Sequence, residues 1–232
     1  MTQTRHGRSP ENVKAIVTCG PSYEPIDQAR RITNFSTGRL GITLANALAR
    51  EGWDVTCFKG EQAACAEPLQ VRTVHSFSTN QDLADRLEKM SRAGRVDAIL
   101  HTAALCDFQV ERVVNERGEE LASPKFSSRE GRLQLILRPA IKVLPRLRNW
   151  FPNARIIGWK YELAGSQAEA LESAWQQLRD SHSDACVLNG MAYGPGFALC
   201  APDRSIKHFA DGAALTSGLA QWLRNERAAL HS

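Results

Sequence analysis

Residues 13–19 read V-K-A-I-V-T-C and stop at Gly20-Pro21. A β-branched, apolar run that ends at a turn pair is typical of a buried strand. We expect a long polar loop from Gly20 to Ser36, followed by an amphipathic helix from Thr37 to Arg50. The apolar face of this helix carries Leu40, Leu44, Ala47 and Leu48. A strand, a loop and a helix in this order predict the first unit of an open α/β sheet.

The alternation of strands and helices continues along the chain. Further strands are expected at Asp54–Lys59, Val71–Val74, Val96–Thr102, Arg155–Trp159 and Ala185–Leu188. Helices are expected after Asn80, which we predict to be a cap, at Gln167–Arg179 and at Ala213–Ala229. This order predicts an α/β, Rossmann-like fold with an open, mainly parallel sheet and helices on both faces.

Three segments depart from this alternation. Arg132–Arg138 alternates leucines with polar residues, which predicts a half-exposed strand. Gly118–Gly131 reads as an irregular, mobile connection that carries Lys125. Ala198–Ala201 and Ile206–Phe209 predict a small late hairpin.

Composition limits the class of protein. The chain has 232 residues, 43% of them hydrophobic, and we expect a flexible segment at 1–12 and a single nucleotide-binding domain at 13–232. The formal net charge is +4, and the basic residues are spread out, so we expect no nucleic-acid partner. The six cysteines form no zinc-like spacing, and no apolar run is long enough for a membrane span or a signal peptide. We therefore expect a cytoplasmic protein without a membrane partner.

The stretch 18–41 reads T-C-G-P-S-Y-E-P-I-D-Q-A-R-R-I-T-N-F-S-T-G-R-L-G. It lies at the carboxyl end of the first strand, where open α/β sheets bind ligands and where a helix N-terminus attracts anions. Gly38 and Gly41 open the helix, with Ser36 or Thr37 as candidate caps. The spacing matches neither G-x-G-x-x-G nor a P-loop. From the residues alone, an ordinary capped βα loop fits equally well.

Two further stretches carry candidate chemistry. Thr102–Phe108 reads T-A-A-L-C-D-F and follows an expected strand; its small residues allow a ligand to approach the backbone, and Asp107 could accept hydrogen bonds from a ribose or a base amine. A turn role for Asp107 is the alternative. Pro124–Ser128 contains Lys125, which could neutralise phosphate charge or could be a solvated surface lysine.

Together these stretches resemble the motifs of phosphopantothenoylcysteine synthetases. The resemblance is most specific at Glu24–Asp27 and at Arg30–Gly41, although Arg31 stands where an apolar residue is common. It extends to Ala103–Phe108 and to Lys125 with its neighbours. Looser matches are Arg138–Lys142, Gly158–Glu162, in which Trp159 replaces a phenylalanine, and Asn189. The similarity covers nearly the whole chain from Lys14 onward.

The resemblance implies a ligase of coenzyme A biosynthesis that joins 4′-phosphopantothenate to L-cysteine through an acyl-nucleotidylate. It implies CTP or ATP as cosubstrate with Mg²⁺, without a dedicated metal-binding cluster in the protein. It assigns catalysis to Asn34 and Lys125, and the substrate phosphate or carboxylate to Arg30, Asn34 and Arg39. The implied nucleotide-binding residues are Gly20, Ser36, Gly38, Gly41, Ala103, Asp107, Trp159, Lys160 and Asn189. This assignment requires Asn34, Asp107 and Lys125 to share one cavity.

The resemblance also implies a stand-alone synthetase that works beside a separate decarboxylase and forms a homodimer, in which Arg132–Arg138 could pair across the interface. Two alternatives remain. One is a non-catalytic nucleotide-binding relative of the same fold. The other is an NAD(P)-dependent Rossmann oxidoreductase, which is disfavoured because the second strand ends in Phe58-Lys59-Gly60 rather than in an acidic residue.

Overall fold

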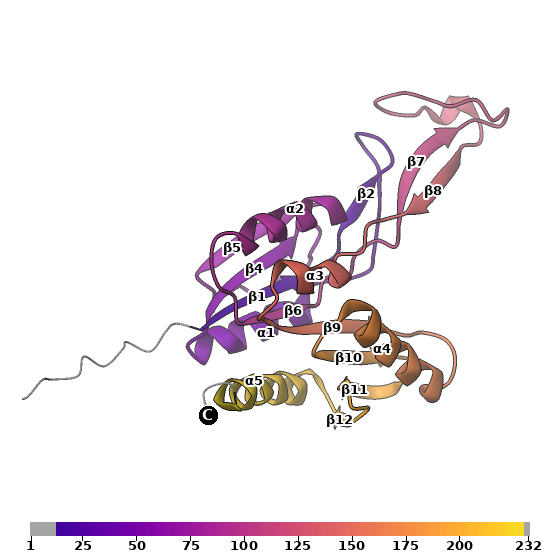
Figure 1. Ribbon diagram of the computed structural model, residues 1–232. Helices are drawn as coiled ribbons and strands as arrows, with labels where there is room; N and C mark the ends of the chain where they lie inside the picture. The colour runs from indigo at the N-terminus through magenta and orange to yellow at the C-terminus, as the bar shows by residue number, and fades with distance from the viewer. Residues whose placement is uncertain (1–12, 230–232) are drawn as a thin grey trace, which may run out of the picture.

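The computed structural model describes residues 13–229, and the predicted flexible segment 1–12 lies outside the described residues. Eight strands of this part of the chain form the central sheet (Figure 1). They are β1 Lys14–Cys19, β4 Asp54–Gly60, β5 Thr73–Phe77, β6 Ala98–His101, β9 Arg155–Tyr161, β10 Ala185–Gly190, β11 Gly194–Cys200 and β12 Ile206–Phe209.

The strand order of the sheet is β12-β11-β10-β9-β6-β1-β4-β5. The six neighbouring strands β5, β4, β1, β6, β9 and β10 are parallel. At the edge of the sheet, β11 pairs antiparallel with β10, and β12 pairs antiparallel with β11, which forms the predicted late hairpin. The predicted fold class is therefore confirmed. The predicted strand at Val71–Val74 was placed too early, since β5 begins at Thr73.

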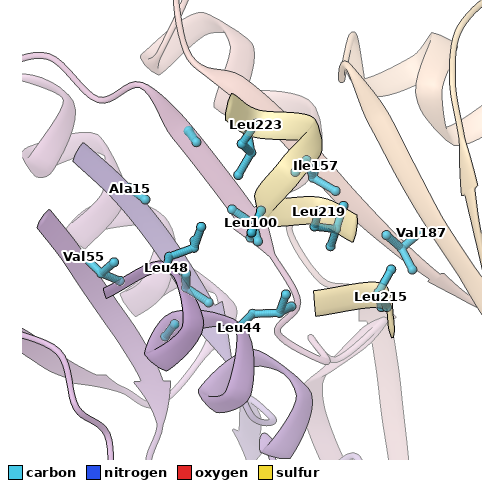
Figure 2. Close-up of a cluster of buried hydrophobic side chains, with 14 of the residues drawn as sticks. Ala15, Leu44, Leu48, Val55, Leu100, Ile157, Val187, Leu215, Leu219 and Leu223 are labelled. Atoms are coloured by element: carbon cyan, nitrogen blue, oxygen red, sulfur yellow. The ribbon is translucent and has the colours of Figure 1, made fainter. Parts of the chain in front are cut away.

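Helices cover both faces of the sheet. They are α1 Arg39–Arg50, α2 Asn80–Ser91, α3 Leu144–Trp150, α4 Gln167–Ser181 and α5 Gly212–Ala229. Figure 2 shows one face, where leucines of α1 and α5 pack together against Ala15, Leu100 and Val187 of the sheet. Side chains of α2, α3 and α4 pack on the other face. The sheet is therefore the middle layer of three.

The buried parallel strands are apolar on both sides because each face is covered by helices. In β1, Ala15 and Val17 point toward α1 and α5, whereas Ile16 points toward α2 and α3. The side chains of Leu44 and Leu48 of α1 are almost completely buried. Burying a side chain of this size stabilises the fold by about 1.5–3 kcal/mol relative to exposing it.

The chain changes direction across the sheet at β1. From β1 it continues to β4 and β5 on one side, and it then returns to β6, β9 and β10 on the other. The carboxyl ends of β1 and β6 therefore flank the topological switch point, which is where open α/β sheets form their ligand crevice.

Two small antiparallel ribbons lie outside the central sheet. The predicted loop Gly20–Ser36 contains the first, formed by β2 Tyr23–Pro25 and β3 Arg31–Thr33. The second, β7 Phe108–Val114 with β8 Gln134–Pro139, projects away from the sheet as an arm (Figure 1). The expected half-exposed strand is β8, but its partner is β7 of the same chain. β7 was not predicted, because its residues show no clean alternation of apolar and polar side chains.

Two predicted helix caps are wrong. Helix α1 begins at Arg39, and its N-cap is Gly38, whose φ of 78° places it in the left-handed region. Thr37 lies one residue before the N-cap, and its hydroxyl accepts from the Arg39 N–H at 3.3 Å. Thr79 rather than Asn80 caps α2, accepting a hydrogen bond from the Asp82 N–H. Helix α3 was not predicted. Within residues 13–229, no helix has the length and apolarity needed to cross a membrane.

Candidate functional site

The turns that follow β1 and β6 are joined by backbone hydrogen bonds. The Thr102 N–H donates to the Thr18 carbonyl at 3.1 Å, and the Ala104 N–H donates to the Gly20 carbonyl at 3.0 Å. The Ala104 carbonyl in turn accepts from the Ser22 N–H at 3.2 Å. The first two sequence motifs therefore form one continuous surface at the switch point. We call residues 20–22 and 102–106 the strand-end turns.

The glycines of the first motif permit close backbone packing. A Cβ on Gly41 would lie 2.4 Å from the Cys19 Cβ, so α1 packs directly on the end of β1. Gly20 has a φ of 80°, and a Cβ there would lie 2.6 Å from the Cβ of Ala63. Gly41 is buried, so the structure explains this glycine by packing rather than by contact with a ligand. Gly38 has no side chain to cap α1, so the N–H groups of the first turn after Arg39, whose own N–H donates to the Thr37 hydroxyl, remain available to an anion.

Asn34 connects the first motif to the second. Its side-chain Nδ2 donates to the Ala104 carbonyl at 3.0 Å, although the residue itself is exposed. Ser36 follows in a tight turn, in which its N–H donates to the Asn34 carbonyl at 2.9 Å. The exposed amide of Asn34 retains its oxygen and its second N–H for other partners.

The buried side chain of Asn80 holds the two strand-end turns together, a role that was not predicted from the sequence. Its Oδ1 accepts from the Ser22 hydroxyl at 2.7 Å, and its Nδ2 donates to the carbonyls of Cys106 at 2.8 Å and Ile141 at 3.1 Å. The residue is 1% exposed. Because a buried amide is stable only when it is hydrogen-bonded, this arrangement ties α2, both turns and the chain before α3 into one conformation.

A cavity of about 450 Å³ opens beside these turns, at the carboxyl ends of β6 and β9. Three predicted nucleotide-binding residues line it, namely Ala103, Trp159 and Lys160. The Trp159 side chain packs against the cluster of α1 and α5, and its buried indole Nε1 has no hydrogen-bond partner among the described residues. The opposite wall is formed by polar side chains of α4, among them Gln177, whose amide donates to the Trp159 carbonyl at 3.2 Å.

The other predicted nucleotide residues lie around the cavity rather than in it. Asp107 follows the lining residue Cys106, and its exposed carboxylate is paired with the Lys142 ammonium, which also lines the cavity. Lys142 belongs to the looser match Arg138–Lys142, which the resemblance places in the lining of the nucleotide pocket. Asn189 lies at the end of β10 opposite Tyr161 of β9. The Lys160 ammonium lies 3.2 Å from the Glu162 carboxylate.

His101 is a buried titratable group in the cavity wall. Its Nδ1 lies 2.9 Å from the Thr18 hydroxyl, and burial lowers the pKa of the imidazole to about 4. The ring is therefore neutral at neutral pH. Nothing in the sequence singled it out, because a histidine inside an apolar strand shows no motif.

The segment that carries Lys125 lies against the tip of the β2–β3 ribbon. The Gln28 N–H donates to the Pro124 carbonyl at 3.0 Å, and the Phe126 N–H donates to the Asp27 carboxylate at 3.2 Å. Lys125 itself is exposed and is not among the residues that line the cavity. Asn34 and Asp107 thus lie next to lining residues of the cavity, and Lys125 lies on the arm. The expectation that the three residues share one cavity is not met, because none of them lines it.

The two predicted phosphate-binding arginines differ in their surroundings. The Arg30 guanidinium is paired with the Asp27 carboxylate at 2.5 Å and donates to the Phe126 carbonyl at 2.7 Å. Arg39 is the first residue of α1 and is exposed. Arg39 is therefore the arginine whose position at a helix N-terminus fits the predicted role without rearrangement.

A mainly parallel sheet with helices on both faces and a cavity at the carboxyl ends of its strands defines an open α/β protein of the Rossmann-like type. Residues 11–212 match the family model described as DNA/pantothenate metabolism flavoprotein C-terminal domain. The chain belongs to this family. It is 30% identical over 203 residues to the coenzyme A biosynthesis bifunctional protein CoaBC of Mycobacterium bovis, covering 86% of this chain and 47% of that protein. It is 28% identical over 190 residues to the CoaBC protein of Thermococcus kodakarensis, covering 82% and 44%.

The chain thus spans about half the length of the curated relatives that it matches. Among solved structures, it resembles the DNA/pantothenate metabolism flavoprotein from Streptococcus pneumoniae with a TM-score of 0.81 and 19% identity, covering 92% of this chain and 99% of that one. It also resembles a Cab2 mutant in complex with phosphopantothenate-cysteine, with a TM-score of 0.71, 16% identity, and coverage of 95% and 88%. At these identities, the structural matches establish the fold alone.

Proposed function

We propose that this protein is a ligase that joins 4′-phosphopantothenate to L-cysteine at the expense of a nucleoside triphosphate. The observation that carries the proposal is the union of the two motifs at the switch point, where Asn34 donates to the carbonyl of Ala104 beside the cavity. The CoaBC relatives are named for coenzyme A biosynthesis, and one structural relative holds phosphopantothenate-cysteine. Both names agree with this reaction.

The proposed reaction has two steps. In the first step, the carboxylate of phosphopantothenate attacks the α-phosphorus, so that a C–O–P bond forms and the bond to pyrophosphate breaks. In the second step, the deprotonated cysteine amine attacks the acyl carbon, and the nucleoside monophosphate leaves with the former carboxylate oxygen. No nucleophilic side chain is required, because the substrate itself is activated.

Neutral and positive groups of the chain suit the charges that develop in this reaction. Asn34 offers uncharged hydrogen bonds to the acyl-phosphate oxygens, and Lys125 and Arg39 neutralise phosphate charge. The Asp107 carboxylate is already paired with the Lys142 ammonium, so it is not available as a strong ligand for a metal ion. We therefore expect a magnesium ion to be held mainly by the phosphates of the nucleotide. Such an ion would supply charge neutralisation at the phosphates.

The experiment that tests the proposal is pyrophosphate release by the purified protein with 4′-phosphopantothenate, cysteine and Mg²⁺. CTP and ATP are supplied in parallel, because the residues that line the cavity do not indicate which of the two nucleotides is used. We expect release that requires phosphopantothenate with at least one of the two nucleotides. Nucleotide binding without release would identify a non-catalytic relative. We place the reaction in the cytoplasm, as the sequence predicts.

We further propose that the protein is a homodimer and that the β7–β8 arm contributes to its interface. Phe108, Leu135 and Leu137 are exposed on this arm by 53%, 36% and 43%. An isolated two-stranded ribbon is marginally stable, and a second copy would cover its apolar side chains. Sedimentation of the Leu137→Lys variant tests this: we expect the dimer to dissociate more readily, and an unchanged dimer would place the interface elsewhere.

A further inference from the structure

The two residues that flank Lys125 are attached to the tip of the β2–β3 ribbon. The Pro124 carbonyl accepts from the Gln28 N–H at 3.0 Å, and the Phe126 carbonyl accepts from the Arg30 guanidinium at 2.7 Å. The Phe126 N–H donates to Asp27 at 3.2 Å. The contacting residues are almost 100 positions apart in the sequence. The contacts therefore hold the arm against the first motif.

Asp27 is the centre of these contacts. Its side chain has no exposed surface, and it accepts from the N–H groups of Ala29 at 2.8 Å and Arg30 at 2.7 Å. The Arg30 guanidinium approaches the same carboxylate at 3.0 Å and 2.5 Å. The Arg30 guanidinium, together with the N–H groups of Ala29, Phe126 and Arg30, holds the pKa of the Asp27 carboxyl far below its usual range. The carboxylate is therefore ionised throughout the physiological range.

The neighbours of Lys125 complete the attachment and leave its side chain exposed. Phe126 is 5% exposed, and the Arg30 guanidinium lies 6.0 Å from the centre of its ring. The Ser123 hydroxyl donates to the Lys125 carbonyl at 2.9 Å and accepts from the Lys125 N–H at 3.3 Å. The backbone on both sides of the lysine is thus held, while the ammonium group is presented to solvent.

We infer that Asp27 is a positioning residue, which holds segment 124–126 on the β2–β3 ribbon and thereby sets where Lys125 acts. This inference rests on the proposed function for the role of Lys125, but the attachment itself can be measured without it. Asp27 does not contact the cavity, and it acts through the segment that it binds. It also holds the Arg30 guanidinium in a fixed orientation, so the aspartate of the first motif organises two cations.

The first test is hydrogen–deuterium exchange on the Asp27→Asn variant. The neutral amide loses the charge-assisted hydrogen bonds to Arg30 and to the Phe126 N–H, so we expect a peptide covering 122–129 to exchange about tenfold faster or more. Asp203→Asn is the matched control, because Asp203 also accepts a backbone hydrogen bond, from the Ser205 N–H at 2.9 Å, in a turn between β11 and β12. Unchanged exchange of 122–129 in Asp27→Asn would overturn the inference.

The second test is kinetic and separates positioning from general stability. We expect Asp27→Asn to lower kcat of pyrophosphate release about tenfold, with a smaller change in the KM for cysteine. In a Lys125→Ala background, the same substitution should have almost no further effect, because the two residues act as one unit. Equal losses in both backgrounds would contradict a role through Lys125.

A second variant and the independence of the two assays allow each outcome to be interpreted. If Asp27→Asn does not fold, Phe126→Ala removes the buried anchor from the other side and should give the same faster exchange of 122–129. If the wild-type protein releases no pyrophosphate, the ligase proposal fails, whereas the exchange experiment still decides whether Asp27 holds the segment.

Discussion

The strand-end turns and the β7–β8 arm hold their candidate residues in different ways. The turns are extensions of β1 and β6, joined by backbone hydrogen bonds and supported by the buried amide of Asn80. The arm lies outside the central sheet and is attached near Lys125 chiefly through Asp27. The strand-end turns are therefore fixed by the central sheet, whereas the position of Lys125 depends on a few side-chain contacts.

The largest effect should come from changing the charge at the strand-end turns. Asn34→Asp places a carboxylate against the Ala104 carbonyl and against the acyl phosphate, so we expect kcat of pyrophosphate-coupled ligation to fall about 10²–10³-fold. Steady-state kinetics measures this loss. Asn153→Asp, in an exposed turn before β9, is the control with the same charge change. Full activity of Asn34→Asp would remove this residue from the site.

Lys125→Ala tests the arm in the same assay. We expect kcat to fall about 100-fold through the loss of phosphate neutralisation. The melting temperature should stay the same, because the Lys125 side chain is exposed. Lys89→Ala, at an exposed position near the end of α2, is the matched control. If Lys125→Ala melted at a lower temperature and kept its activity, the lysine would be structural and the arm would not belong to the site.

The pH dependence of stability should reveal the buried histidine of the cavity wall, His101. The pKa of His101 is lowered to about 4, so the unfolded state binds the proton more tightly and stability falls as the pH drops below the unfolded pKa. Between about pH 7.5 and about pH 5, this one group should remove about 2 kcal/mol of unfolding free energy. Urea unfolding of the wild type and of His101→Gln measures it. Parallel pH profiles of the two proteins would show that His101 is not the source.

The smallest effect should come from a position outside both regions. Ser166 caps α4 through a reciprocal contact with Glu169, and Ser166→Ala should cost about 1 kcal/mol of stability. We expect thermal unfolding to show a small decrease in melting temperature and kcat to stay unchanged. A large loss of activity would mean that the position of α4, which lines the cavity, is set by this cap.

Sequence patterns predicted the parts of the fold in which local preference and burial agree. The runs that became β1, β9 and β10 are apolar because helices cover both sides of the sheet, and α1 and α4 have clear amphipathic spacing. The β2–β3 ribbon was missed because two strands of three residues carry no periodic signal. β7 was missed because its side chains do not alternate between a core and solvent.

The candidate site was predictable where it depends on continuous motifs and not where it depends on distant partners. The motifs predicted that Asn34, Asp107 and Lys125 share one cavity; the structure joins Asn34 to Ala104 of the second motif, whereas Lys125 lies on the arm. The contacts of Asp27 with Phe126 and of Asn80 with Cys106 join segments that are far apart in sequence, so they leave no local pattern. The cap at Gly38 was missed because a left-handed glycine replaced the side-chain cap that polar neighbours suggested.

The central claim is that a carboxylic acid meets the α-phosphate of a triphosphate at the switch point of the sheet. The most direct test uses phosphopantothenate labelled with ¹⁸O in its carboxylate, followed by mass spectrometry of the products. We expect one labelled oxygen in the nucleoside monophosphate, because the acyl–oxygen bond breaks when cysteine attacks. Label in inorganic phosphate, or turnover without transfer of label, would contradict the acyl-nucleotidylate and with it the proposed use of this site.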